Sequence, residues 1–68
     1  MYEEVIEILE RRAMCCDEIA TKEDQKKPND KVLHKIYAAQ IAAAQLRETA
    51  AEIRRLVDLG QIKEDANA

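Results

Sequence analysis

The sequence predicts an all-α protein in which two helices form an antiparallel, coiled-coil-like hairpin. Its 68 residues include one glycine, one proline and neither Phe nor Trp, which leaves little material for turns or sheet edges. The good helix formers Ala, Leu, Glu, Gln, Lys and Arg dominate the composition. Apolar residues recur at intervals of three and four in two stretches, which a short polar segment separates. A short connection between two long helices makes them antiparallel neighbours.

The first helix is expected over residues 2–25. One apolar stripe at helical spacing consists of Val5, Ile6, Leu9, Ala13, Cys16 and Ala20. Further apolar side chains lie on the flank of this stripe: Ile8, Cys15 and Ile19. Together they cover about half of the circumference, whereas contact with one neighbour needs an arc of about 100°. The first helix is therefore expected to contact at least two other helices.

The turn is expected over residues 26–29, where the polar run of residues 21–27 is followed by Pro28. Proline disfavours helical geometry in the residue before it. Asn29 is a favourable N-cap for the next helix, and Asp30 in the first turn would interact well with the helix dipole.

The second helix is expected over residues 30–59. It carries a heptad ladder of Val32, Ile36, Ala39, Ala43, Leu46, Ala50, Ile53 and Val57. Such a seam must be covered by another helix, and the first helix is the candidate. Gly60 can adopt the left-handed conformation that ends a helix, and Ile62 can then fold back on the last turn. The hairpin domain is expected to span residues 1–62, and residues 63–68 are expected to form a frayed C-terminal tail.

A second apolar stripe on the second helix cannot face the first helix at the same time as the seam. The predicted dimer interface consists of Leu33, Tyr37, Ile41, Ala44 and Ala51. Two hairpins would bury these stripes against each other as a four-helix bundle. The alternative is a monomer with an exposed flank. The many alanines favour a close approach of the helices, although alanine is also a strong helix former.

The longer second helix is expected to extend beyond the first by about 10 Å at its C-terminal end. Apolar side chains flanked by charge commonly mark sites where a partner binds. The predicted partner-binding residues are Arg54, Arg55, Leu56, Leu59 and Ile62. The alternative is that this end packs on Met1 and Tyr2 of the dimer mate.

No catalytic, cofactor or metal site is predicted. Cys15 and Cys16 are adjacent, so their side chains point about 100° apart on a helix and make neither an ordinary disulfide nor a C-x-x-C pair. Both cysteines are expected to be reduced and buried. His34 is expected on the polar side of the second helix, and the chain contains no serine with which it could act. A structural zinc site lacks ligands unless subunits share them.

Charge is distributed unevenly along the chain, whose net charge is −3. Residues 1–24 carry eight acidic and three basic side chains, and the rest carries six acidic and eight basic ones. This favours attraction between the two helices, or alternatively an acidic outer face that binds a basic partner. No run approaches the roughly 20 apolar residues of a membrane span, and the N-terminus lacks the basic start of a signal peptide. The interpretation is a cytoplasmic protein that does not bind membranes.

The function favoured by these features is that of a non-enzymatic homodimer that binds a larger partner protein and inhibits or adapts it. In size and layout the chain resembles the plasmid repressor-of-primer protein, an antiparallel dimer of helical hairpins that binds paired RNA loops. The resemblance concerns architecture and implies an RNA-binding alternative without assigning any residue to it. Nucleic acid is the less expected partner because the first helix is acidic. A small-ligand site between subunits is a third and weaker alternative.

Overall fold

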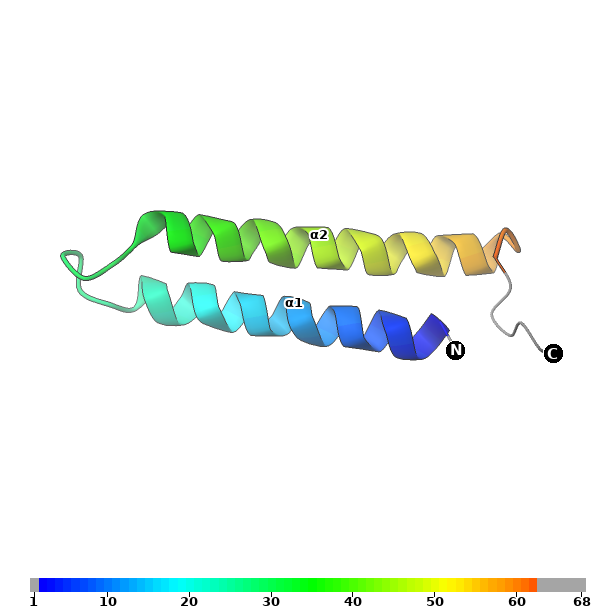
Figure 1. Ribbon diagram of the computed structural model, residues 1–68, viewed down its shortest axis with the longest axis horizontal. Helices are drawn as coiled ribbons and strands as arrows, with labels where there is room; N and C mark the ends of the chain where they lie inside the picture. Colours follow the sequence, from blue (N-terminus) through cyan, green and yellow to red (C-terminus); the bar gives the residue numbers. More distant parts are fainter. Residues whose placement is uncertain (1, 63–68) are drawn as a thin grey trace.

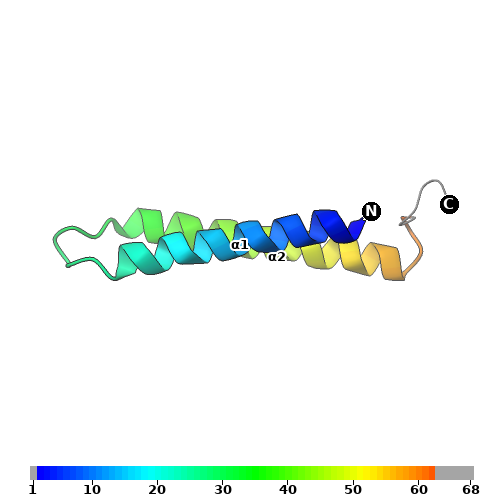
Figure 2. The same ribbon diagram turned by 90° about the horizontal axis from the view of Figure 1, so that it is seen from below.

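The computed structural model, which describes residues 2–62, is an antiparallel hairpin of two helices (Figure 1). Helix α1 spans Tyr2–Asp24 and helix α2 spans Leu33–Asp58. The hairpin is a thin rod of 55 × 15 × 11 Å, and the two helices cross at a shallow angle when the hairpin is seen from below (Figure 2). The predicted all-α hairpin is thus confirmed. Neither helix in the described range is long and apolar enough to cross a membrane.

Helix α1 turns one heptad stripe toward α2. The stripe is buried or half-buried at every position, and its members are Tyr2, Ile6, Leu9, Ala13, Cys16, Ala20 and Glu23. Ile6 is 4% exposed, whereas its neighbour Val5 is 41% exposed. The seam therefore passes through Ile6 and leaves Val5 outside it, because consecutive residues of a helix point about 100° apart.

Helix α2 supplies the other side of the seam. Seven residues of the expected ladder are buried or half-buried: Ile36, Ala39, Ala43, Leu46, Ala50, Ile53 and Val57. The ladder residue Val32 is an exception, because it precedes the helix and is 39% exposed. Ala13 and Ala43 are the least exposed side chains, at 0% and 1%. Small side chains in the middle of the seam are consistent with closely spaced helix axes.

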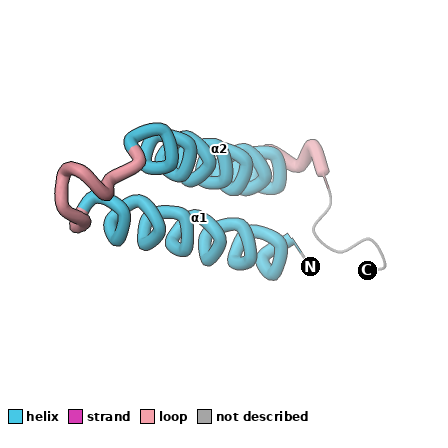
Figure 3. The backbone as a smooth tube through the Cα atoms, turned by 60° about the vertical axis from the view of Figure 1, so that its left-hand side comes forward, coloured by secondary structure: helices cyan, strands magenta, loops and turns pink. Residues whose placement is uncertain are grey.

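The connection covers residues 25–32 and is longer than the expected turn (Figure 3). The N-cap of α2 is Val32, with extended backbone and no side-chain cap hydrogen bond. Asn29 and Asp30 lie before the helix, so they are neither its cap nor its first turn. Instead, the Val32 N–H donates a hydrogen bond of 3.0 Å to Glu23 of α1. This bond joins the end of one helix to the start of the next, and α2 begins three residues later than expected.

Helix α2 ends in a Schellman motif, in agreement with the prediction made from the position of Gly60 in the sequence. Gly60 has a φ of +74°. Its N–H donates to the Val57 carbonyl at 3.0 Å, and the Gln61 N–H donates to the Leu56 carbonyl at 2.9 Å. These two bonds satisfy carbonyls that the last turn would otherwise leave free. The Ile62 N–H also donates to Leu56, at 3.4 Å, so the chain folds back onto the helix end.

Candidate interaction surfaces

The loop end of the hairpin is organised around the buried carboxylate of Glu23. This side chain is 3% exposed. Besides the Val32 N–H it accepts a hydrogen bond from Lys26 Nζ at 3.0 Å, and Lys35 Nζ lies 3.6 Å away. The Val32 N–H, followed by the Lys26 ammonium, lowers the pKa of Glu23 below its ordinary value. Burial acts in the opposite direction and is outweighed.

One side of the seam is bridged by ion pairs between the helices. Arg47 contacts Asp17, and Arg54 contacts Glu10 at 3.3 Å. Asp17 has a lowered pKa and Arg47 a raised one, in each case chiefly because of the hydrogen bond that joins them. On each helix the two residues lie seven apart, so both pairs flank the same edge of the seam. All four side chains are about half exposed, so solvent screens the attraction.

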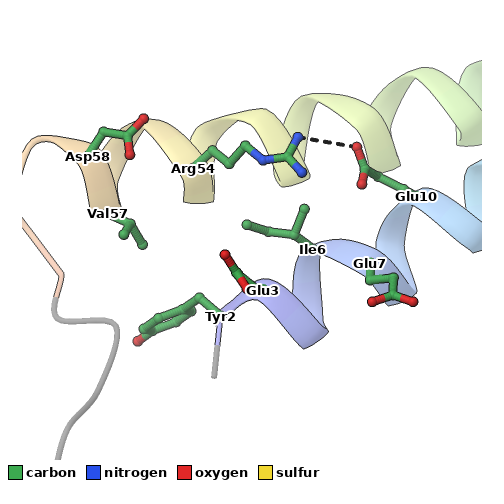
Figure 4. Close-up of a pocket in the computed structure, with 8 residues that line it drawn as sticks. All are labelled: Tyr2, Glu3, Ile6, Glu7, Glu10, Arg54, Val57 and Asp58. Carbon is green, nitrogen blue, oxygen red and sulfur yellow. Dashed lines mark hydrogen bonds and ion pairs between the residues drawn. The ribbon is translucent and has the colours of Figure 1, made fainter. Parts of the chain in front are cut away.

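The open end of the hairpin holds a groove between the first turns of α1 and the last turns of α2 (Figure 4). Its lining consists of Tyr2, Glu3, Ile6, Glu7, Glu10, Arg54, Val57 and Asp58. Ile6 lies on its floor, and the Arg54 guanidinium reaches across to Glu10 (Figure 4). Tyr2 and Val57 lie at the mouth (Figure 4). The groove is open, and most of the side chains that line it are charged.

The residues of the predicted dimer interface all lie on the exposed surface of α2. Leu33, Tyr37 and Ile41 are 55%, 58% and 59% exposed, and Ala44 and Ala51 are exposed as well. Their spacing places them on one side of the helix, beyond the edge bridged by Arg47 and Arg54. The hairpin alone therefore leaves these apolar side chains uncovered.

The predicted partner-binding residues differ in their ion pairing and in their exposure. Arg54 is paired with Glu10, and Arg55 with Glu52 of its own helix. Leu56 and Ile62 are half-buried, and Leu59 is 58% exposed.

Helix α2 extends beyond α1 by less than the sequence predicts. Helices α1 and α2 contain 23 and 26 residues, a difference of about 5 Å at 1.5 Å per residue. Tyr2 lines the same groove as Val57 and Asp58, so α1 reaches the last turn of α2. The overhang is smaller because α2 begins three residues later than expected and is therefore shorter.

Cys15 and Cys16 are both free thiols. The expectation that both are buried is wrong for Cys15, which is exposed, whereas Cys16 is half-buried in the seam. Cys15 lies seven residues after Ile8, on the flank that α2 does not cover. His34 is exposed in the first turn of α2. Within residues 2–62, no three His, Cys, Asp or Glu side chains lie close enough together to hold a metal ion.

Two features were not assigned by sequence reasoning. The role of Glu23 could have been found by extending the stripe of Cys16 and Ala20 by three residues, since that step reaches Glu23. A carboxylate at a seam position at the end of a helix indicates a charge that must be satisfied locally. The second feature is the flank of α1, which the sequence predicts to be wide but does not mark as a site.

Comparison with protein-family models, with curated proteins and with solved structures gave no match to this chain.

Proposed function

We propose that this protein is a non-enzymatic interaction module that forms a homodimeric four-helix bundle and binds and modulates a partner protein. The single observation that carries the proposal is the exposure of Leu33, Tyr37 and Ile41, three large apolar side chains on one side of α2. Leaving such residues in water forgoes about 1.5–3 kcal/mol for each side chain that a second surface would bury.

The charge pattern on this side supports a second copy as the cover. The adjacent edge combines acidic residues of α1 with basic residues of α2, as in the Asp17–Arg47 and Glu10–Arg54 pairs. A two-fold contact places the same patch on both subunits, so a patch that carries both signs can be complementary to itself. A patch whose charges all have the same sign cannot be complementary to itself in this way.

Oligomeric mass tests the dimer directly. Light scattering on a sizing column should give twice the monomer mass of 7.8 kDa. Tyr37→Glu combined with Ile41→Glu should give the monomer, because it places four charges in the dimer interface. Ala38→Glu, on an exposed position outside that interface, is the matched control and should remain dimeric. A wild-type mass near 7.8 kDa at micromolar concentration contradicts the proposal.

The partner-binding surface is proposed at the open end, where Leu59 is exposed beside the half-buried Leu56 and Ile62. Leu59→Asp should abolish co-purification of the partner from the native host while leaving dimer mass and helicity unchanged. Leu33→Asp should dissociate the dimer and leave co-purification of the partner unchanged. If Leu59→Asp instead dissociates the dimer, the open end belongs to assembly and not to partner binding.

The RNA-binding alternative has less support. The bases that would contact phosphate, Lys31, Lys35, Arg47, Arg54 and Arg55, each lie within 4.0 Å of an acidic side chain of the same chain. Phosphate contacts would have to displace these pairs. Binding that weakens steeply with added salt would restore this alternative.

A further inference from the structure

The two ends of the described hairpin carry net charges of opposite sign. The loop end, residues 22–35, contains five basic and three acidic side chains, a net charge of +2 with His34 neutral. The open end, residues 2–11 and 52–62, contains six acidic and three basic side chains, a net charge of −3. The middle, residues 12–21 and 36–51, contains two basic and three acidic ones. These counts include the side chains that are paired within the chain, so the difference between the ends remains after those pairs form.

The exposed stripe of α2 is asymmetric in side-chain size. Its large apolar members, Leu33, Tyr37 and Ile41, lie in the half of α2 next to the loop end. Ala44 lies near the middle of the helix, and Ala51 is the member of the stripe in the half next to the open end. Because close packing requires surfaces that fit, a stripe that is bulky at one end packs evenly only against a stripe with the reverse order.

Both asymmetries disfavour a parallel pair of subunits. In a parallel pair each residue of the contact line faces its own copy. Tyr37 would then meet Tyr37 of the second copy and hold apart helices that the small Ala51 needs close together. Asp58, seven residues after Ala51, would meet Asp58 of the second copy, and like charges that face each other are destabilising. The two open ends, each with a net charge of −3, would also lie side by side.

An antiparallel pair avoids these conflicts. With the two-fold axis beside Ala44, positions equally far on either side of the axis face each other. Tyr37 then faces Ala51 of the second copy, because each lies seven residues from Ala44. Position 58 falls opposite position 30, in the connection of residues 25–32, which contains three lysines and one acidic residue, Asp30. The acidic open end of each subunit therefore lies beside the basic loop end of the other.

This pairing also places the connection of one subunit beside the open-end groove of the other. Arg54 and Asp58 line that groove from α2 (Figure 4). Its full lining contains four carboxylates and one guanidinium, with Ile6 on the floor. A lysine side chain suits such a lining, because its aliphatic stem packs on apolar atoms while its ammonium group contacts carboxylates. Lys27 of the connection is exposed and forms no ion pair with any residue that the structure describes.

We propose that two copies of the chain pair antiparallel through the α2 stripe, and that lysine side chains from the connection of each subunit, Lys27 foremost, enter the acidic groove of the other. The inference rests on the proposed homodimer, to which it adds the direction of the subunits and a second contact. The two-fold axis repeats this second contact, so that both grooves of the dimer are occupied.

Disulfide trapping tests the direction of the subunits. Every variant also carries Cys15→Ala and Cys16→Ala, so the introduced cysteine is the only one. In a glutathione buffer, Ala44→Cys should give a disulfide-linked dimer in either direction and serves as the control. Ala51→Cys alone should stay reduced, because its two copies would lie about 21 Å apart at 1.5 Å per residue, whereas a disulfide needs Cα atoms within about 7 Å. A mixture of Ala51→Cys and Tyr37→Cys should give the mixed disulfide, which mass spectrometry identifies.

Charge exchange tests the contact between the connection and the groove. Lys27→Glu and Glu3→Lys should each raise the dissociation constant of the dimer about fivefold at low salt, because a contact between exposed charges is lost twice. Analytical ultracentrifugation measures this constant. The combined variant should lose less than the product of the two effects, since the exchanged charges attract again across the antiparallel interface. Lys22→Glu, on the flank of α1 that α2 does not cover, is the matched control. It should show no such recovery when it is combined with Glu3→Lys.

The outcomes separate this inference from the proposed homodimer. A disulfide-linked dimer of Ala51→Cys alone shows parallel subunits, which overturns the inference and leaves the homodimer. Independent effects of Lys27→Glu and Glu3→Lys in an antiparallel dimer overturn the lysine contact. A wild-type monomer at micromolar concentration, or a dimer in which Ala44→Cys forms no disulfide, contradicts the proposed α2 interface itself.

Discussion

The two ends of the hairpin are held together by different interactions. At the loop end, Ala20 packs in a buried cluster with Ile36 and Ala39, and the Glu23 carboxylate ties α1 to the start of α2. At the open end, Ile6 and Ala50 are buried, but the other seam residues there are only half-buried: Tyr2, Leu9, Ile53 and Val57. The polypeptide links the two helices at the loop end but not at the open end. At the open end, the Schellman motif satisfies backbone carbonyls of α2 alone.

This difference indicates where the hairpin can accept another molecule. At the loop end, the apolar Ala20, Ile36 and Ala39 and the charged Glu23 are all buried within one chain. The open end keeps half-buried apolar side chains beside the exposed Leu59. Uncovered apolar surface with charged neighbours is typical of contact sites. The same seam therefore leaves more of its apolar surface exposed at the open end than at the loop end.

The most direct test of this difference between the two ends is to replace an isoleucine by alanine at each end. Ile36→Ala at the loop end removes a side chain that is 6% exposed and should cost about 2–4 kcal/mol of unfolding free energy. Ile53→Ala at the open end removes a half-buried one and should cost about 1 kcal/mol. Urea denaturation followed by circular dichroism, at one protein concentration, measures both. Equal losses would show that the open end is covered in solution, for example by a second subunit.

The buried carboxylate provides the second largest expected effect. Glu23→Gln keeps the size of the side chain but removes the charge that attracts Lys26 and Lys35. The urea midpoint should fall clearly more than for Glu18→Gln, an exposed residue of the same helix. A fall no larger than that of the control would mean that the carboxylate is not held as the structure shows.

The same residue should make stability depend on pH in a defined direction. The pKa of Glu23 is lowered in the folded protein from an ordinary value of 4.5. On acidification the unfolded chain therefore takes up the proton first, which favours unfolding. The stabilisation from Glu23 is present above about pH 4.5 and is lost as the pH falls through the lower folded pKa. Urea midpoints of wild type and Glu23→Gln should converge in this range, and parallel curves would contradict the assignment.

The sequence was sufficient for the features that repeat and insufficient for those that occur once. The ladder from Ile36 to Val57 and the cap at Gly60 follow from spacing and backbone preference, which act locally. The start of α2 could not be placed, because Asn29 is a good local cap that loses to a contact with Glu23 nine residues before Val32. The exposure of Cys15 and Val5 depends on which half of a wide apolar arc α2 covers. Periodicity does not decide that choice.

A smaller effect is expected at the cap of the open end. Gly60→Ala keeps the chain length, and no atom lies within 4 Å of the added methyl group, so the cost comes from the backbone alone. An L-residue in the left-handed region costs about 1–2 kcal/mol, and fraying of the last turn should reduce the measured loss to about 1 kcal/mol. Gly60→Asn should cost less, because Asn tolerates this conformation. Equal effects of the two substitutions would indicate that φ at residue 60 does not remain positive.

The smallest effect is expected for the ion pair that crosses the open groove. Glu10 and Arg54 are 47% and 58% exposed and 3.3 Å apart. A double-mutant cycle of Glu10→Gln and Arg54→Gln should give a coupling energy of about 0.5 kcal/mol, as is usual for exposed pairs. It should disappear in about 1 M salt, where the Debye length is about 3 Å. A coupling above about 1 kcal/mol that survives this salt would mean that the pair is shielded from water. Because the hairpin alone leaves both side chains half exposed, such shielding would have to come from a bound molecule over the open end.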